Sequence, residues 1–177
     1  MSKNTALIII DVQEDMFSNP HYPLYKGSEL LNNVGSLIDK ARSSNVPVIY
    51  IQHTENDDEP MGKGKHGWYI HHQIAPLEDD VVILKYTPDS FHKTNLHEFL
   101  SSKNISKIVI AGLQTDYCID TTCRRAFSLG YETVLVQDAH STFDSNALSA
   151  EQIVDHHNRI LGSWFAKLVP CDEISFD

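Results

Sequence analysis

Basic residues are scarce in this chain. Lys and Arg together number 14 against 24 Asp and Glu, which gives a formal net charge of −10. Proteins whose main partner is nucleic acid or an anionic membrane need an excess of positive charge to neutralise phosphates. We therefore expect no nucleic-acid partner and no membrane partner, and we expect a small-molecule substrate instead.

Long apolar runs and cysteines are also few. No apolar run approaches the length that crosses a bilayer, and the N-terminal segment lacks the basic and long apolar regions of a secretory signal. Three cysteines are an odd number and do not suggest a disulfide framework. The sequence thus predicts a cytoplasmic protein. The absence of a composition shift, repeat or linker predicts a single domain over residues 1–177.

Short apolar runs rich in β-branched residues alternate with amphipathic segments. The expected strands cover residues 5–10, 47–52, 81–84, 106–112, 132–137 and 167–169, and the expected helices cover 28–43, 94–102, 118–129 and 148–161. A long polar loop reaches residue 68, and a short helix is expected through His71, His72 and Gln73. This alternation predicts an α/β fold with a parallel sheet of about six strands and helices on both faces.

Three residues that carry chemistry follow expected strands. Asp11 comes directly after the first strand, Lys85 follows 81–84, and Cys118 follows 106–112 and a short polar turn. Because the carboxyl ends of parallel strands meet at one edge, where α/β proteins bind ligands, we expect the three to share a crevice. A carboxylate, an ammonium and a thiol there make a plausible base, electrostatic partner and nucleophile.

Cys118 is expected at the start of the helix 118–129. Free backbone N–H groups and the helix dipole at that position favour the thiolate over the thiol. The alternative is a small packing residue, which is the commonest fate of a free cysteine. For Asp11 the corresponding alternative is a carboxylate that caps a helix or lies in a loop. For Lys85 the alternative is a solvent-exposed residue at the end of a strand. The three residues together favour a catalytic site.

The segments that contain these residues carry a resemblance. Asp11-Val12-Gln13, Lys85 with its flanking residues, and Gly112 to Cys118 resemble the Asp, Lys and Cys motifs of the isochorismatase-like cysteine hydrolase superfamily, in the same order and spacing. The resemblance spans nearly the whole chain. It implies a Rossmann-like three-layer α/β/α sandwich with strand order 3-2-1-4-5-6. It also implies hydrolysis of a C–N bond in a small amide, ureide or carbamoyl compound, in the metal-independent amidohydrolase branch.

The resemblance also implies roles for individual groups. Asp11 takes the thiol proton, Cys118 attacks the carbonyl to give a thioester, and Lys85 holds the charge of its neighbours. The backbone N–H groups of Gln114 and Cys118 correspond to the oxyanion hole, and the peptide bond that matches Leu113–Gln114 is cis in relatives. No cofactor is implied, and relatives commonly form dimers or tetramers, so a homo-oligomer is expected.

The substrate pocket is predicted from the positions of residues along the chain. The side chains expected to reach the crevice, because they follow the strands or the polar loop, are Gln13, Phe17, His53, Trp68 and Tyr117. Nicotinamidases in this superfamily bind a metal through an Asp-x-His pair after the second strand. Here Ile51 stands where the Asp would be, so no metal site is expected.

The glycines in Gly62–Gly67 match the string G-x-G-x-x-G. They do not directly follow a strand, so we interpret the segment as a mobile loop rather than a nucleotide site. A lid whose Lys63 or Lys65 meets an anionic substrate is the functional alternative. Three other functions remain open: isochorismatase-type vinyl ether hydrolysis, a metal-assisted nicotinamidase, and a non-catalytic module that binds a small ligand. Cys118 counts against the first, because enzymes of that activity typically lack the cysteine.

Overall fold

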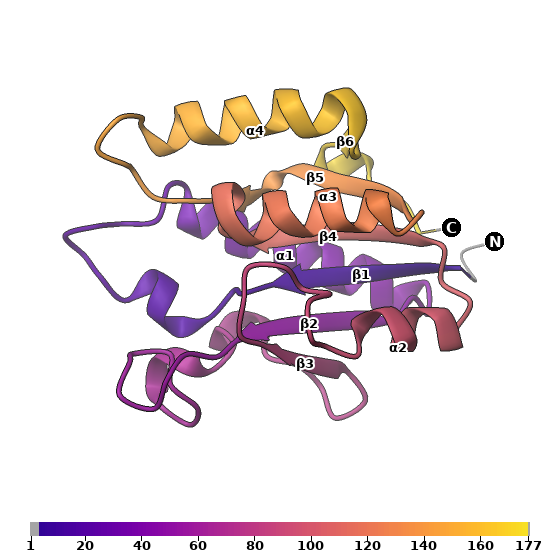
Figure 1. Ribbon diagram of the computed structural model, residues 1–177, viewed down its shortest axis with the longest axis horizontal. Coiled ribbons are helices and arrows are strands. Elements are labelled where there is room, and N and C mark those ends of the chain that lie inside the picture. The colour runs from indigo at the N-terminus through magenta and orange to yellow at the C-terminus, as the bar shows by residue number, and fades with distance from the viewer. Residues whose placement is uncertain (1–3, 177) are drawn as a thin grey trace.

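The computed structural model describes residues 4–176 as a three-layer α/β/α sandwich (Figure 1). The central sheet is parallel throughout and has the strand order β3-β2-β1-β4-β5-β6. Its strands are β1 (Thr5–Ile10), β2 (Val48–His53), β3 (Val81–Lys85), β4 (Lys107–Leu113), β5 (Glu132–Ser141) and β6 (Lys167–Val169). The predicted fold class and strand order are confirmed.

Two apolar clusters on opposite faces of the sheet form the core. Successive β1 side chains point to opposite faces, so Leu7 and Ile9 belong to one cluster, and Ile8 and Ile10 belong to the other. Helix α1 (Gly27–Ser43) covers the first face. Helices α2 (Leu96–Ser102), α3 (Asp120–Ser128) and α4 (Ala150–Trp164) cover the second. The central strands are therefore buried on both sides, which explains their continuous apolar runs.

Short helical turns lie between these elements. They are η1 (Glu14–Phe17), η2 (His66–Trp68), η3 (His72–Ile74), the π-helical turn η4 (Thr115–Ile119) and η5 (Cys171–Glu173). The prediction that a helix starts at Cys118 was wrong. Cys118 lies inside the π-helical turn, and α3 begins only at Asp120.

Gly112 fixes the approach of β4 to β1 just before this turn. Its φ is +127°, and a Cβ at this position would lie 2.1 Å from the carbonyl oxygen of Ile10. Only glycine has neither a Cβ nor a steric penalty in this conformation. The end of β4 therefore packs directly against the end of β1. Asp11 is the next residue after β1.

Within residues 4–176, no helix combines the length and the apolar character that a membrane span requires.

Candidate active site

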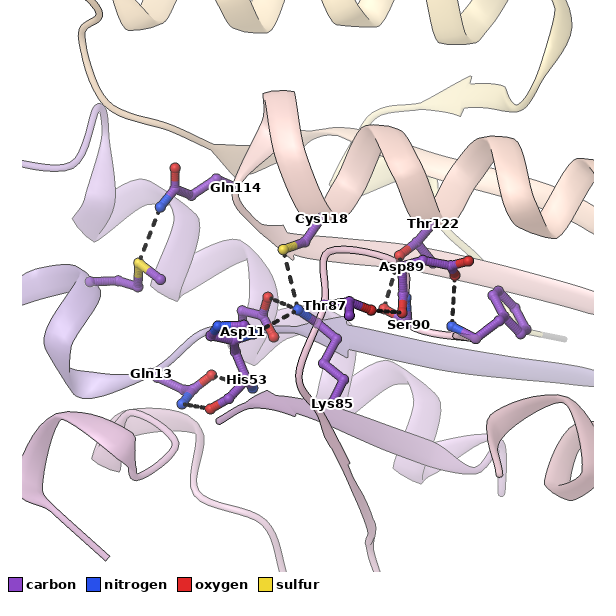
Figure 2. A network of polar contacts seen from close by, with 12 residues as sticks. Asp11, Gln13, His53, Lys85, Thr87, Asp89, Ser90, Gln114, Cys118 and Thr122 are labelled. Atoms are coloured by element: carbon purple, nitrogen blue, oxygen red, sulfur yellow. Dashed lines mark hydrogen bonds and ion pairs between the residues drawn. The ribbon is translucent and has the colours of Figure 1, made fainter. Parts of the chain in front are cut away.

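The carboxyl edge of the sheet brings three predicted residues into contact (Figure 2). The Lys85 Nζ atom lies 2.6 Å from Asp11 Oδ2 and 3.2 Å from Cys118 Sγ. Asp11 follows β1, Lys85 ends β3, and Cys118 lies in the turn after β4. The parallel sheet thus places a carboxylate and a thiol on the same ammonium group.

Burial sets the charges of this cluster. Lys85 and Asp11 are 0 % and 1 % exposed. Burial disfavours the ammonium form of Lys85, but the neighbouring Asp11 and Cys118 outweigh it, so the pKa of Lys85 is raised and the side chain stays cationic. Asp11 Oδ1 is buried without a hydrogen-bond partner among the described residues. That oxygen is therefore available to accept a proton.

Cys118 is a thiol in this arrangement. Burial raises its pKa to about 12, the negative charge of Asp11 adds to the rise, and Lys85 opposes it. The prediction that the helix start favours a thiolate was wrong, because desolvation outweighs Lys85 and because α3 begins two residues later. A nucleophilic Cys118 needs a base that removes its proton, and Asp11 is in place for that step.

The turn that carries Cys118 is tightly fixed. The carbonyl of Gln114 accepts the backbone N–H groups of Tyr117 and Ile119 at 3.2 and 3.0 Å. The Leu113–Gln114 peptide bond is cis, as the resemblance implied. Gln114 and Cys118, whose backbone N–H groups correspond to the oxyanion hole of relatives, thus lie at the start of the turn and near its end.

A chain of hydrogen bonds, buried between Thr115 and His140, holds the same turn from the side. Asn158 Nδ2 donates to the carbonyl of Gln137, so its Oδ1 accepts from His140 Nε2 at 2.9 Å. His140 Nδ1 then accepts the hydroxyl of Thr115 at 2.9 Å. Burial lowers the pKa of His140 to about 4, which keeps the ring neutral. The sequence analysis did not predict these hydrogen bonds. A histidine at the end of an apolar strand could have indicated a buried polar contact.

His53 also belongs to the cluster. Its Nδ1 lies 3.4 Å from Lys85 Nζ, and because an ammonium only donates, Nδ1 accepts and Nε2 carries the proton. Burial and then Lys85 lower the pKa of His53. His53 is therefore a neutral imidazole with one N–H group left to donate.

Gln13 does not line the pocket, and its side chain instead binds backbone groups. It is 0 % exposed. Its Nε2 donates to the carbonyls of His53 and Trp68 at 2.9 and 2.7 Å, and its Oε1 accepts the His53 N–H at 2.8 Å. The side chain thereby joins the end of β2 to the η2 turn, and it holds His53 beside Lys85.

Two open cavities lie at this edge. The larger, about 860 Å³, is lined among others by Met16, Glu55, Gln114, Asp116, Tyr117 and Thr142. The smaller, about 690 Å³, is lined by His53, Tyr86 and residues of the loop after β2, and Glu55 belongs to both. Gln114 precedes the π-helical turn and Tyr117 precedes Cys118 within it, so the larger cavity, here called the acidic cleft, adjoins the turn that carries Cys118.

The predicted pocket residues divide accordingly. Tyr117 lines the acidic cleft and His53 lines the smaller cavity. Gln13, Phe17 and Trp68 line neither cavity. The Phe17 ring instead packs edge-on against His71 at 4.7 Å, and Trp68 Nε1 donates to Thr54 Oγ1 at 2.9 Å. Lys63 and Lys65, the candidates for an anion-binding lid, are exposed and line neither cavity.

One group of side chains has the composition of a metal site. Ligand atoms of Glu14, His71 and His72 lie within 4.8 Å of one another. However, His71 Nδ1 accepts the N–H of Gln73 at 3.3 Å, which leaves the proton on the Nε2 that faces Glu14. His72 Nδ1 contacts the same carboxylate at 2.9 Å. Hydrogen bonds within the group thus account for its geometry, and a cation there needs the other tautomer of His71.

Known proteins resemble this chain over most of its length. The family model named Isochorismatase domain matches residues 5–160. The chain belongs to the isochorismatase family. It is 32 % identical to the isochorismatase family protein YrdC of Bacillus subtilis over 100 % of this chain and 97 % of that protein. It is 30 % identical to Nicotinamidase 3 of Arabidopsis thaliana, over 98 % and 88 % of the two chains.

Solved structures agree with the fold of this family member. The crystal structure of an isochorismatase from Pseudomonas putida superposes with a TM-score of 0.91 at 29 % identity, and covers 98 % of this chain and 91 % of that one. The family that the sequence motifs indicated is thus confirmed, and the chain is a hydrolase of the isochorismatase family.

Proposed function

We propose that this hydrolase cleaves a C–N bond of a small amide, ureide or carbamoyl compound through a thioester on Cys118. The observation that carries the proposal is the position of Lys85 Nζ between Asp11 and Cys118, together with a buried Asp11 oxygen that has no hydrogen-bond partner in the described part of the chain. The name of Nicotinamidase 3 supports an amide substrate.

The proposed reaction has two halves. Asp11 Oδ1 removes the thiol proton as Cys118 Sγ attacks the carbonyl carbon, and the oxyanion is stabilised by the N–H groups of Gln114 and Cys118. The tetrahedral intermediate collapses, the C–N bond breaks, and the proton on Asp11 passes to the leaving nitrogen. Water then attacks the thioester while Asp11 accepts its proton, the C–S bond breaks, the proton on Asp11 returns to Cys118 Sγ, and the acid product leaves.

Lys85 supports both halves through its charge. The ammonium compensates the Asp11 carboxylate before proton transfer, and it lies 3.2 Å from the sulfur that becomes negative during attack. Because Lys85 is buried, this interaction is screened less than one at the surface. A thiol with a raised pKa can thus be deprotonated during the attack rather than before it.

Replacing the nucleophile and the base tests the proposal. Cys118→Ala and Asp11→Asn each remove ammonia release from a panel of small amides, ureides and carbamoyl compounds. The double variant is hardly worse than either single one, because the two groups act as a unit. Mass spectrometry of the wild-type protein quenched during turnover shows an acyl adduct on the peptide that contains Cys118.

The alternatives give different results in the same assays. Substantial hydrolysis by Cys118→Ala contradicts the thioester route and favours vinyl ether chemistry or a metal-activated water. Dialysis against a chelator leaves the proposed activity unchanged, whereas a loss that zinc or iron restores would point to a metal-assisted nicotinamidase. Binding without turnover of any compound indicates a non-catalytic module.

A further inference from the structure

The acidic cleft has walls of one charge. Four carboxylates line it, from Asp15, Glu55, Asp116 and Asp144, and no Lys, Arg or His is among its lining residues. The smaller cavity, which shares Glu55, adds Asp57 and Glu59. A charged ligand in this space therefore meets negative potential from several directions.

Hydrogen bonds hold these carboxylates in place. Asp116 accepts the hydroxyl of Thr142 at 2.6 Å, and Glu55 accepts the backbone N–H of Met61 at 3.1 Å. Asp144 accepts the backbone N–H of Ala150 at 2.8 Å, and Asp15 accepts the hydroxyl of Ser18 at 3.3 Å.

None of the four carboxylates forms an ion pair with another residue in the range 4–176. Their charge is thus fixed in position and is not neutralised by the protein.

Aromatic faces line the same cleft. Tyr22 stacks on Phe143 with ring centroids 5.1 Å apart, and Tyr117 projects from the turn of the nucleophile. Tyr22 and Tyr117 are 47 % and 58 % exposed. Aromatic rings attract organic cations through their negative faces, and they also pack against the apolar part of a ligand. Carboxylates and aromatic rings together suit an alkylammonium or guanidinium group.

The position of the cleft connects it with the reaction. Gln114 and Tyr117 line it, and Cys118 follows Tyr117 directly in the same π-helical turn, so the cleft adjoins the turn that carries the nucleophile. Asp11 Oδ1, which is buried and has no hydrogen-bond partner among residues 4–176, lies at the same edge of the sheet. The carboxylates therefore belong to the surroundings of a nucleophile.

We infer that the substrate is a small amide or carbamoyl compound that carries a cationic ammonium or guanidinium group, which the acidic cleft binds while the carbonyl lies at Cys118. The inference rests on the proposed function for the reaction itself. It replaces the alternative of an anionic substrate met by Lys63 or Lys65, since neither lysine lines the cleft.

Three amides of equal length test the charge selectivity directly. They are 5-aminopentanamide, which is cationic, hexanamide, which is neutral, and adipamate, which is anionic. We expect kcat/KM for ammonia release to fall in that order, with about a tenfold step from cationic to neutral if three carboxylates each contribute as partly exposed ion pairs do. The step becomes smaller as salt is added, because the charges are partly exposed.

Thiol-directed probes test the cleft without hydrolysis. Two methanethiosulfonates that modify cysteines are compared, a cationic one with a trimethylammonium group and an anionic one with a sulfonate group. The rate at which each modifies the protein is divided by the rate at which it reacts with free 2-mercaptoethanol. We expect the normalised rate at Cys118 to favour the cationic reagent by about tenfold. Mass spectrometry assigns the modified cysteine, since Cys123 and Cys171 are buried.

Matched variants locate the effect. The variant Glu55→Gln/Asp116→Asn/Asp144→Asn keeps the oxygen that accepts each hydrogen bond, and it should lose most of the cation preference in both assays. The control Asp39→Asn/Asp79→Asn/Glu98→Gln changes the net charge equally at three exposed positions outside the acidic cleft, and it should keep the preference.

The outcomes separate this inference from the proposed function. Hydrolysis of all three amides at similar kcat/KM, with equal labelling rates, would overturn the inference and leave the hydrolase proposal standing. Cation-selective labelling that depends on the cleft carboxylates, with no amide hydrolysed, would support cation binding in the acidic cleft and count against the proposed C–N bond hydrolysis. Equal loss of preference in the control variant would attribute the effect to net charge and overturn the inference.

Discussion

The ammonium of Lys85 lies 2.6 Å from the carboxylate of Asp11, and both side chains are buried. Each charge loses its hydration on folding, and the other charge compensates for that loss. Removing one partner of such a pair leaves an uncompensated buried charge, which is far more costly than losing an ion pair at the surface. The Lys85–Asp11 pair therefore affects the free energy of unfolding, and this effect can be measured separately from catalysis.

Lys85→Met should lower the free energy of unfolding by about 3–5 kcal/mol, because Asp11 then stays buried without its counter-ion. Lys107→Met is the matched control. Its pair with Glu132 spans 3.2 Å with side chains 39 % and 65 % exposed, so the loss should be about 1 kcal/mol or less. Urea denaturation of both variants measures the two losses of unfolding free energy. Similar losses would contradict the conclusion that burial makes the Lys85–Asp11 pair more important for stability than a surface pair.

Alkylation of Cys118 should be slow at neutral pH. Burial and the charge of Asp11 raise its pKa, so the thiolate fraction, and with it the rate with iodoacetamide, should increase about tenfold per pH unit from pH 7 to 9. Asp11→Asn should speed the reaction at each pH, because it removes one cause of the raised pKa. Quantitative mass spectrometry measures the rate, and a rate independent of pH over this range would indicate a thiolate.

The sequence predicted the triad because its geometry depends on few local facts. Apolar runs end at Asp11 and Lys85, and any parallel sheet with right-handed crossovers brings such strand ends to one edge. β2 lies between β3 and β1, and the long Lys85 side chain reaches from β3 to Asp11 and to the turn after β4. The strand order came from the resemblance, since no single-chain pattern specifies it.

The missed features depend on contacts between distant segments. Gln13 looked like a pocket residue, but its amide satisfies backbone groups at His53 and Trp68, 40 and 55 residues away. The π-helical turn at Cys118 is held by His140 and Asn158, from β5 and α4. Local sequence also carries no measure of desolvation, which decided the protonation state of Cys118.

Acid should destabilise the protein through His140. Its pKa is about 4 in the folded state against 6.5 for the free side chain, so the unfolded chain binds a proton first as the pH falls. This stabilising contribution is fully present above pH 6.5 and is lost progressively as the pH falls to 4, where the cumulative loss is about 3 kcal/mol.

The variant His140→Gln should therefore show a flatter dependence of unfolding free energy on pH between 6.5 and 4 than the wild type. His92→Gln, at an exposed histidine, should follow the wild type. Urea denaturation at several pH values gives the free energy of unfolding of each protein against pH. Subtracting the wild-type curve from each variant's curve removes the contribution of the carboxylates, which all three proteins share. Identical slopes for His140→Gln and the wild type would contradict the assignment.

Gly112 should be the least replaceable glycine near the site. An alanine Cβ would lie 2.1 Å from the Ile10 carbonyl oxygen in a backbone conformation with φ +127°, so steric overlap and backbone strain add. Each effect costs about 1–3 kcal/mol, and Gly112→Ala should lower the free energy of unfolding by more than about 2 kcal/mol.

The shift that Gly112→Ala forces on the end of β1 should also displace Asp11 and reduce turnover. Gly35→Ala is the matched control, because Gly35 lies in α1 with no atom within 4 Å of an added Cβ. Alanine is the better helix former, so this variant should gain up to about 1 kcal/mol. Thermal and urea unfolding compare the two variants. A Gly112→Ala protein as stable and active as the wild type would show that β1 and β4 can separate without disturbing the site.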